Sequence, residues 1–272
     1  MTGLALVFGA VVGLSLGLTG GGGAIFAVPL LVFGMAVPAR EAVGVSLAAV
    51  GTTAFVGFLH RLRLCEVELR TGMLFAVAGM LGAPLGAQLS EFIPDALLMS
   101  LFAGLMGIVA ARLWRQAGAS ARGVRDYETT DQASGPTCER DEAGALVLTS
   151  RCAVLLVLVG VATGLLSGLF GVGGGFVIVP ALVLFSGMSI HRAVGTSLMV
   201  ITLVSAAGLA THVWSERDVP VAVTALFVVG GVAGMFAGQS LGRRLSALRL
   251  QRTFAVAMLL VAVFIITRNV NA

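Results

Sequence analysis

Eight apolar runs, each nearly free of charged residues, make up most of this 272-residue chain. A helix needs about 20 residues to cross the hydrocarbon core of a bilayer, and six of the runs are near that length. Only 11% of the residues are charged, too few to cover the surface of a water-soluble fold. The sequence therefore predicts an all-α integral membrane protein. The runs cover residues 3–37, 42–59, 71–89, 96–111, 153–190, 193–211, 219–242 and 253–267.

The first and fifth runs differ from the others in length and in glycine content. At about 35 residues each, they are too long for one helix and too short for two full spans with a turn. A glycine cluster interrupts both runs near the middle, in GLTGGGGAIFAVP and in GLFGVGGGFVIVP. Transporters with discontinuous helices carry this signature. Each run is therefore predicted to form a discontinuous or re-entrant helix pair.

The two glycine clusters belong to a longer internal duplication. Residues 13–47 align without a gap with residues 164–198, and 16 of these 35 positions are identical. The ordered glycine and proline matches are not explained by biased composition alone. The sequence predicts two homologous repeats of about four apolar segments each. The first membrane repeat covers residues 1–114, a polar linker covers 115–150, and the second membrane repeat covers 151–272.

The positions of the arginines indicate that the second repeat is inverted relative to the first. Basic residues favour cytoplasmic loops, and all 17 basic residues of this chain are arginine. With the polar linker in the cytoplasm, a single crossing by the fifth run would place the four arginines of residues 243–252 outside. A hairpin that returns to its own side places them inside. We therefore predict inverted repeats in the inner (plasma) membrane, with the linker cytoplasmic and both termini outside.

The sequence argues against several functional classes. A chain without lysine has no Walker-type phosphate-binding motif, and its arginines lie between the runs rather than on a nucleic-acid-binding face. No Cys/His spacing suits a metal ion. All 13 acidic residues fall in loops or at run edges, so paired carboxylates for intramembrane catalysis are missing. We expect no nucleic acid, no cofactor, no metal and no enzymatic activity.

The glycine clusters have two interpretations that the sequence leaves open. They could serve close helix packing alone, as small residues do in membrane proteins. Alternatively, their backbone amides could also face a substrate at the start of a half-helix, where the helix dipole favours an anion. Pro29 and Pro180 are predicted helix-break residues, because proline suits a first helical turn and frees a carbonyl deeper in a helix. A third set of glycines has the spacing of helix packing: Gly79, Gly82, Gly86, Gly231, Gly234 and Gly238.

The paired motifs GLTGGGGAIFAVPLL and GLFGVGGGFVIVPAL resemble the signature of the TauE/SafE family of sulfite exporters, also described as 4-toluene sulfonate uptake permeases. The four-plus-four pattern of runs, the polar linker and the echo of AVGVSL in AVGTSL extend the resemblance over the whole chain. The resemblance implies a multipass transporter of sulfur-containing oxyanions or organosulfonates. In one departure, GGGG in the first motif faces GVGGG in the second, so the two sites need not be equivalent.

An anion held inside the membrane needs hydrogen-bond donors, and no arginine lies within the runs. Backbone amides and hydroxyls remain. Ser46 and Ser197 occupy equivalent places in the repeats, although a helical hydroxyl often bonds the carbonyl one turn back. The predicted substrate-binding residues are Gly20, Gly21, Gly22, Gly23, Ser46, Gly171, Gly173, Gly174, Gly175, Thr196 and Ser197. The other hydroxyls within the runs include Thr19, Thr52, Thr53, Ser167 and Thr202, whereas His60, His191 and His212 lie at run ends and are expected at the interface.

The sequence thus predicts a secondary transporter that exports sulfite or a related sulfur-containing oxyanion or organosulfonate. A non-transporting membrane scaffold or assembly protein, and a transporter of another small anion, are the alternatives. Export is favoured because no Asp, Glu or His lies deep in a run to relay protons, and a potential negative inside drives anions outward. The expected partners are a small anionic substrate and the lipid bilayer, and nothing in the sequence indicates an oligomeric state.

Overall fold

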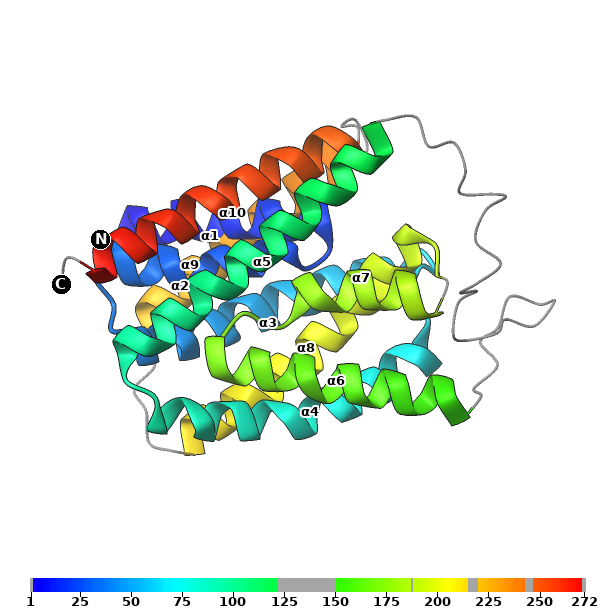
Figure 1. Ribbon diagram of the computed structural model, residues 1–272, viewed down its shortest axis with the longest axis horizontal. Coiled ribbons are helices and arrows are strands. Elements are labelled where there is room, and N and C mark those ends of the chain that lie inside the picture. Colours follow the sequence, from blue (N-terminus) through cyan, green and yellow to red (C-terminus); the bar gives the residue numbers. More distant parts are fainter. Residues whose placement is uncertain (1, 122–149, 187, 215–219, 243–246, 271–272) are drawn as a thin grey trace. The chain divides into compact units, whose positions relative to one another are not determined.

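A computed structural model describes residues 2–121, 150–186, 188–214, 220–242 and 247–270, and the described chain is helical with no strand. The all-α prediction is therefore confirmed. Figure 1 labels most of the helices. In chain order the elements are α1 (Thr2–Thr19), η1 (Gly22–Phe26), α2 (Ala27–Pro29), η2 (Leu30–Gly34), α3 (Ala39–Arg63), α4 (Leu69–Phe92), α5 (Asp95–Ala121), α6 (Ser150–Phe170), α7 (Gly175–Ser186), α8 (Ile190–Trp214), α9 (Val221–Gly242) and α10 (Ala247–Val270).

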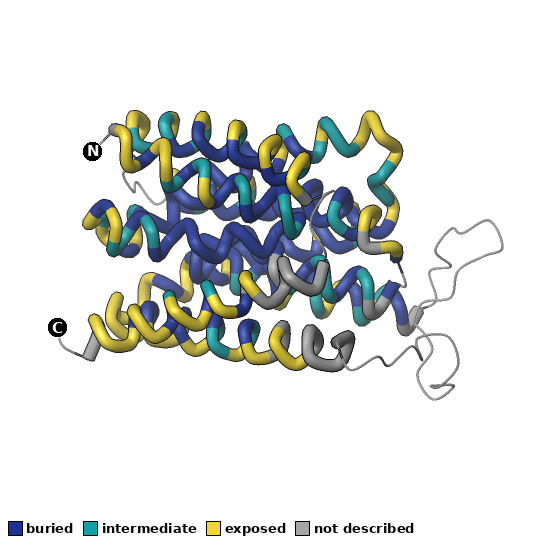
Figure 2. Tube along the Cα trace, turned by 90° about the horizontal axis from the view of Figure 1, so that it is seen from above, coloured by how far each residue is buried: buried dark blue, intermediate teal, exposed yellow. Residues whose placement is uncertain are grey.

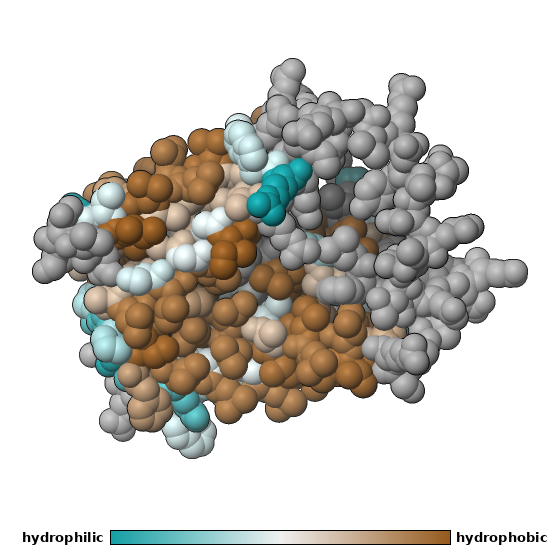
Figure 3. Space-filling view, viewed as in Figure 1, coloured by the Kyte–Doolittle hydropathy of each residue, from teal (hydrophilic) through white to brown (hydrophobic). Residues whose placement is uncertain are grey.

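Five of these helices are long and apolar enough to cross a membrane, namely α3, α4, α6, α8 and α9. Shorter apolar segments occur in α1, in residues 22–34, in α5 and in α10. Large apolar side chains are exposed on these helices, and Leu81, Ile108 and Leu158 are each more than 60% exposed. Apolar side chains also dominate the described part of the face in Figure 3. An apolar surface of this kind suits contact with lipid rather than water.

The chain divides into two compact units, and each combines segments from both halves of the sequence. The first unit comprises Met1–Phe92 and Pro136–Gln239. Its two most buried long helices are α3 and α8, and 67% of the apolar stretch of each is buried. They contact each other, and buried segments occupy the interior in Figure 2. A central pair of helices shielded by others is therefore the core of this unit.

The second unit comprises Ile93–Gly135 and Ser240–Ala272. Within it, α5 and α10 contact each other and run side by side in opposite directions (Figure 1). Buried side chains along this pair include Phe102, Met106 and Met258. Most of the predicted linker at 115–150 lies outside the described residues, because α5 ends at Ala121 and α6 begins at Ser150.

The helix boundaries follow the numbering of the predicted duplication. The helices α3 and α8 are both 25 residues long and begin 151 residues apart. The helix pairs α4/α9 and α5/α10 each begin 152 residues apart. In Figure 1, α1 begins at the marked N-terminus and α6 begins at the opposite end of the view, so the two helices run in opposite senses.

Small residues let helices of the first unit approach each other closely, as their spacing predicts. A Cβ atom on Gly82 or Gly86 of α4 would overlap a carbonyl of α6, at Val161 and Leu165 respectively. The equivalent glycines of α9, Gly234 and Gly238, meet the carbonyls of Ala10 and Leu14 on α1 in the same way. Close backbone contact of this kind is how helices associate without a hydrophobic driving force between them.

Candidate functional site at the two glycine turns

Both long glycine-containing runs are broken at the glycine clusters. The helix α1 ends at Thr19 and the next helical residue is Gly22, while α6 ends at Phe170 and α7 starts at Gly175. We call the residues between these helices the first turn (Gly20 and Gly21) and the second turn (residues 171–174). The helices α6 and α7 on either side of the second turn run in opposite directions (Figure 1).

The turns require glycine for conformational reasons. Gly20 has a φ of 74°, and Gly173 and Gly174 both have a φ of 67°, in the left-handed region that costs other residues about 1–2 kcal/mol. Two successive residues in this region cannot continue a right-handed helix. The break in the helix therefore lies at the glycines themselves.

The two prolines lie further along the chain than the turns. Pro180 is inside α7, which continues past it to Ser186. Pro29 ends the short α2, and the chain then changes to the π-helix η2. These residues therefore lie in the helical segments that follow the turns.

The two turns meet each other inside the first unit. A Cβ atom on Gly21 would lie 2.8 Å from Cα of Gly175, and one on Gly175 would lie 2.6 Å from Cα of Gly21. Backbone therefore touches backbone between segments that are far apart in the sequence. The predicted glycines of both clusters, residues 20–23, 171 and 173–175, are all buried.

Several backbone amides at the turns have no acceptor among the residues that the structure describes. Gly20 donates to the carbonyl of Leu16, and Gly171 donates to that of Ser167. Within the described chain, no hydrogen-bond acceptor is found for the amides of Gly21, Val172, Gly173 and Gly174. Buried amides are almost always paired in folded proteins. Unpaired amides that precede a helix form a concentration of positive potential that suits an anion.

The symmetric serines on the central helices hold the opposite turn. Ser46 on α3 donates its hydroxyl hydrogen to the carbonyl of Gly171 at 2.6 Å. Ser197 on α8 donates to the carbonyl of Gly20 at 2.5 Å, and it also approaches the carbonyl of Val194 at 2.8 Å. Each serine therefore connects its own half of the sequence to the glycine turn of the other half. In this structure both hydroxyl hydrogens point at protein carbonyls.

Thr196, next to Ser197, makes its hydrogen bond to a different part of the chain. Its hydroxyl oxygen accepts a hydrogen bond from the backbone amide of Glu68 at 3.0 Å, and its side chain is fully buried. The carboxylate of Glu68 accepts a hydrogen bond from Thr71. Thr196 thus connects the start of α8 to the loop between α3 and α4.

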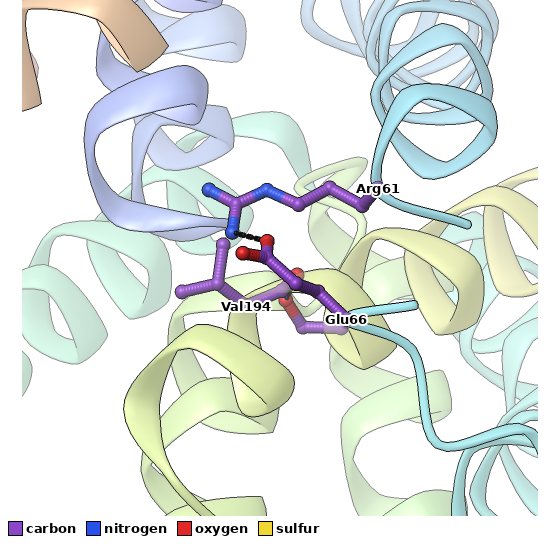
Figure 4. A network of polar contacts seen from close by, with 4 residues as sticks. Arg61, Glu66 and Val194 are labelled. Carbon is purple, nitrogen blue, oxygen red and sulfur yellow. Dashed lines mark hydrogen bonds and ion pairs between the residues drawn. The ribbon is translucent and has the colours of Figure 1, made fainter. Parts of the chain in front are cut away.

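The end of α3 and the same loop form an ion pair close to the first turn. One nitrogen of the Arg61 guanidinium lies 2.5 Å from a carboxylate oxygen of Glu66, and these side chains are 15% and 31% exposed. Figure 4 shows Val194 of α8 beside this pair. A Cβ atom on Gly20 would lie 2.5 Å from Cγ1 of Val194. Val194 therefore lies next to both the ion pair and the first turn.

Two residues at the site were not predicted from the sequence. His212 was expected at the interface, but it is only 1% exposed and lies against Gly44 of α3. Ser205 is fully buried on α8, and its Oγ has no hydrogen-bond partner among the described residues. Ser205 lies eight residues after Ser197, about 80° further around α8, so both fall within one broad face of the helix. The spacing from Ser197 was the feature of the sequence that could have identified Ser205 as a residue near the site.

No metal site is formed by the described residues, since no group of three or more His, Cys, Asp or Glu side chains comes together. The donors at the turns are amides and hydroxyls, which provide hydrogen bonds rather than the carboxylate, imidazole or thiolate ligands that metals prefer. Amide and hydroxyl donors of this kind can bind a ligand that carries hydrogen-bond acceptors.

Sequence comparisons place this chain among known membrane proteins. Residues 5–265 match the family described as "Sulfite exporter TauE/SafE". A "Probable membrane transporter protein" of Xylella fastidiosa (strain Temecula1) is 34% identical over 266 residues, which cover 96% of this chain and 93% of that protein. The "Probable membrane transporter protein YdhB" of Bacillus subtilis is 28% identical over 226 residues, covering 83% and 84% respectively. No solved structure shows significant similarity.

Proposed function

Because the chain belongs to the sulfite exporter TauE/SafE family, we propose that this membrane transporter exports sulfite or a related sulfur-containing oxyanion or organosulfonate. The proposed substrate site lies at the two glycine turns. The observation that carries the proposal is the set of buried amides at Gly21, Val172, Gly173 and Gly174 that have no acceptor within the described part of the chain. Amide donors in a buried site stabilise negative charge without introducing a buried positive charge.

We propose further that the chain consists of two inverted repeats, with residues 1–114 and 151–272 joined by a cytoplasmic linker at 115–150. Each repeat would open with a broken helix pair and continue with three spanning helices. The matched boundaries of α3 and α8 support this arrangement. The opposite senses of α1 and α6 in Figure 1 support it as well. Arginine-rich loops favour the cytoplasmic side of the inner membrane. In this arrangement both termini would lie on the external side of that membrane.

The reciprocal serine bonds give this arrangement a mechanism. Ser46 holds the second turn and Ser197 holds the first, across 125 and 177 residues of sequence. In inverted-repeat transporters, one repeat moves against the other around a fixed site near the midplane. Bonds between a helix of one repeat and the turn of the other would break and re-form during such a movement. The buried turns correspond to a closed state in this scheme.

The membrane potential is sufficient to drive the proposed export. An anion that leaves a cell with a negative interior gains about 2.3 kcal/mol per charge for each 100 mV. Amides and hydroxyls do not titrate near neutral pH, so a site built from them needs no coupled proton. Transport without chemical change of the substrate also implies that the protein is not an enzyme.

Proteoliposomes containing the purified protein test the substrate. Uptake of labelled sulfite, thiosulfate, sulfate, taurine and sulfoacetate would be compared between the wild type and the variant Gly173→Leu, whose side chain would intrude on the unpaired amides. Gly107→Leu in α5 is the matched control, because a Cβ atom there meets nothing within 4 Å. We expect at least one oxyanion to be transported by the wild type and by Gly107→Leu, but not by Gly173→Leu. Absence of transport of the whole panel by the wild type would favour the scaffold or another anion.

Vesicles of defined orientation test the driving force. They would be loaded with the transported anion, and the potential would be set with valinomycin and potassium. Efflux from the cytoplasmic face should accelerate as that side becomes more negative. Transport that ignores the potential and depends strictly on a pH gradient would contradict potential-driven export.

A further inference from the structure

Ser205 and Ser167 differ from the other helical hydroxyls of the described chain, because each is buried and has no hydrogen-bond partner there. Most of the others donate to a carbonyl three or four residues back on their own helix, as is usual for serine and threonine in helices. Examples of this bond are those of Ser15, Thr19, Thr52, Thr202, Thr211 and Thr224. Ser205 has the same local option and does not use it among the described residues. Leaving a buried hydroxyl unpaired costs about 1–3 kcal/mol, so the position needs an explanation.

The hydroxyl of Ser205 lies directly beside the second turn. A Cβ atom on Gly173 would lie 3.3 Å from Oγ of Ser205, 3.0 Å from Ile201 and 3.4 Å from Val50. Ile201 and Val50 are buried and apolar, so neither offers the hydroxyl a polar side chain. Gly173 is also one of the residues whose amide has no acceptor in the described ranges of the chain. An unpaired side-chain donor and an unpaired backbone donor thus lie next to each other at one point of the core.

The first turn lacks this combination. At the offset of the duplication, the residue equivalent to Ser205 is Ala54, which has no hydroxyl. The residues equivalent to Gly173 and Gly174 are Gly22 and Gly23, which form the start of η1 instead of an open turn. Among the described residues, the unpaired side-chain donor is therefore found at the second turn and has no counterpart at the first, although the backbone pattern is duplicated.

We propose that Ser205 and the amides of Val172, Gly173 and Gly174 form a single oxyanion site on the second turn. This inference rests on the proposed function and narrows it to one anion per chain. The ligand would be an oxyanion with at least two acceptor oxygens, such as sulfite, because one oxygen can receive the hydroxyl hydrogen while another receives the amides. The surrounding apolar side chains strengthen such bonds by excluding water. Binding would require α8 to move away from Gly173, because Ser205 and Ile201 close over it here.

The test uses the full-length protein in detergent, with sodium sulfite as the probe and sodium chloride as the comparison salt. Binding of labelled sulfite and the melting temperature would be measured for the wild type, Ser205→Ala and Ser205→Cys. The loss of one hydrogen bond to a charged ligand should raise the Kd about 10- to 100-fold in both variants. The melting temperature without sulfite should stay constant or rise in Ser205→Ala, because the variant removes an unpaired buried hydroxyl. A purely structural serine would give the opposite result for stability.

Thr202→Val is the matched control on the same helix. Its hydroxyl already donates to Leu198 at 2.8 Å, so its removal should leave the Kd for sulfite unchanged. Ser205→Cys keeps nearly the same volume with a much weaker donor and covers the case in which alanine disturbs packing. Wild-type affinity in Ser205→Ala or Ser205→Cys would overturn the inference, and if Gly173→Leu still abolished binding the proposed function would survive. A wild type that binds none of the oxyanions in the panel would refute the proposed function and this inference together.

Discussion

The bonds from Ser46 and Ser197 to the opposite turns make a quantitative prediction about stability. Both side chains are fully buried, and their hydroxyls lie 2.6 Å from the carbonyl of Gly171 and 2.5 Å from that of Gly20. Replacing either serine with alanine removes the donor and leaves a buried carbonyl without that bond. An unsatisfied buried acceptor costs about 1–3 kcal/mol. For a chain of this size each kcal/mol corresponds to a fall of about 2–4 °C in Tm.

The two substitutions should differ in a predictable way. Ser46 directs its hydrogen to one carbonyl, whereas Ser197 shares its hydrogen between Gly20 and Val194. A shared hydrogen bond is weaker in each direction, so Ser46→Ala should lower the Tm at least as much as Ser197→Ala. The assay is thermal unfolding of each purified variant in the same detergent, together with its transport rate in proteoliposomes.

Thr52→Val provides the control for this comparison. Thr52 is exposed on α3, and its hydroxyl bonds the carbonyl of Ala48 one turn back at 2.7 Å. Its replacement should change the Tm by less than about 2 °C, because surface substitutions usually stay within about 0.5 kcal/mol. If Ser46→Ala and Ser197→Ala were as stable as Thr52→Val, the serine bonds would not hold the turns and the reasoning would fail.

Three further predictions follow from other parts of the chain. Single cysteines should react from the cytoplasmic side at position 130 and from the outside at positions 93 and 215, and labelling near Arg249 from outside would exclude the inverted arrangement. Gly164→Ala should lower the free energy of unfolding by about 1–3 kcal/mol, since its Cβ would overlap the Gly79 carbonyl. Gly104→Ala is the control and should be neutral or stabilising, because a Cβ atom there meets nothing within 4 Å. Equal effects of the two substitutions would disprove the packing argument. Arg61→Gln and Glu66→Gln should each change the Tm only slightly, because partly exposed ion pairs contribute about 0–1 kcal/mol. The change should be smaller at high salt, which screens the pair. A loss of several kcal/mol in the free energy of unfolding that does not depend on salt would contradict this prediction.

The sequence alone was sufficient for the features that depend on local physics. Apolar runs must form helices in lipid, because no water is present to pair the backbone groups. Clustered glycines in a run too long for one helix predicted the breaks at Gly20 and at Gly171–Gly174, and their positive φ values explain why. The close packing of Gly82, Gly86, Gly234 and Gly238 was likewise predictable from spacing alone.

The partners of the polar side chains depended on the tertiary structure. The repeat symmetry singled out Ser46 and Ser197, but local rules suggested a carbonyl one turn back, and the principal acceptors lie 125 and 177 residues away. Ser205 was not predicted as a site residue, because an unpaired hydroxyl is defined by the residues that surround it in space and not by its neighbours along the chain. The burial of His212 against Gly44 likewise depends on the packing of α8 against α3 and not on the sequence around His212. Helix formation is settled within one or two turns of chain, whereas burial and hydrogen-bond partners are settled by which helices meet.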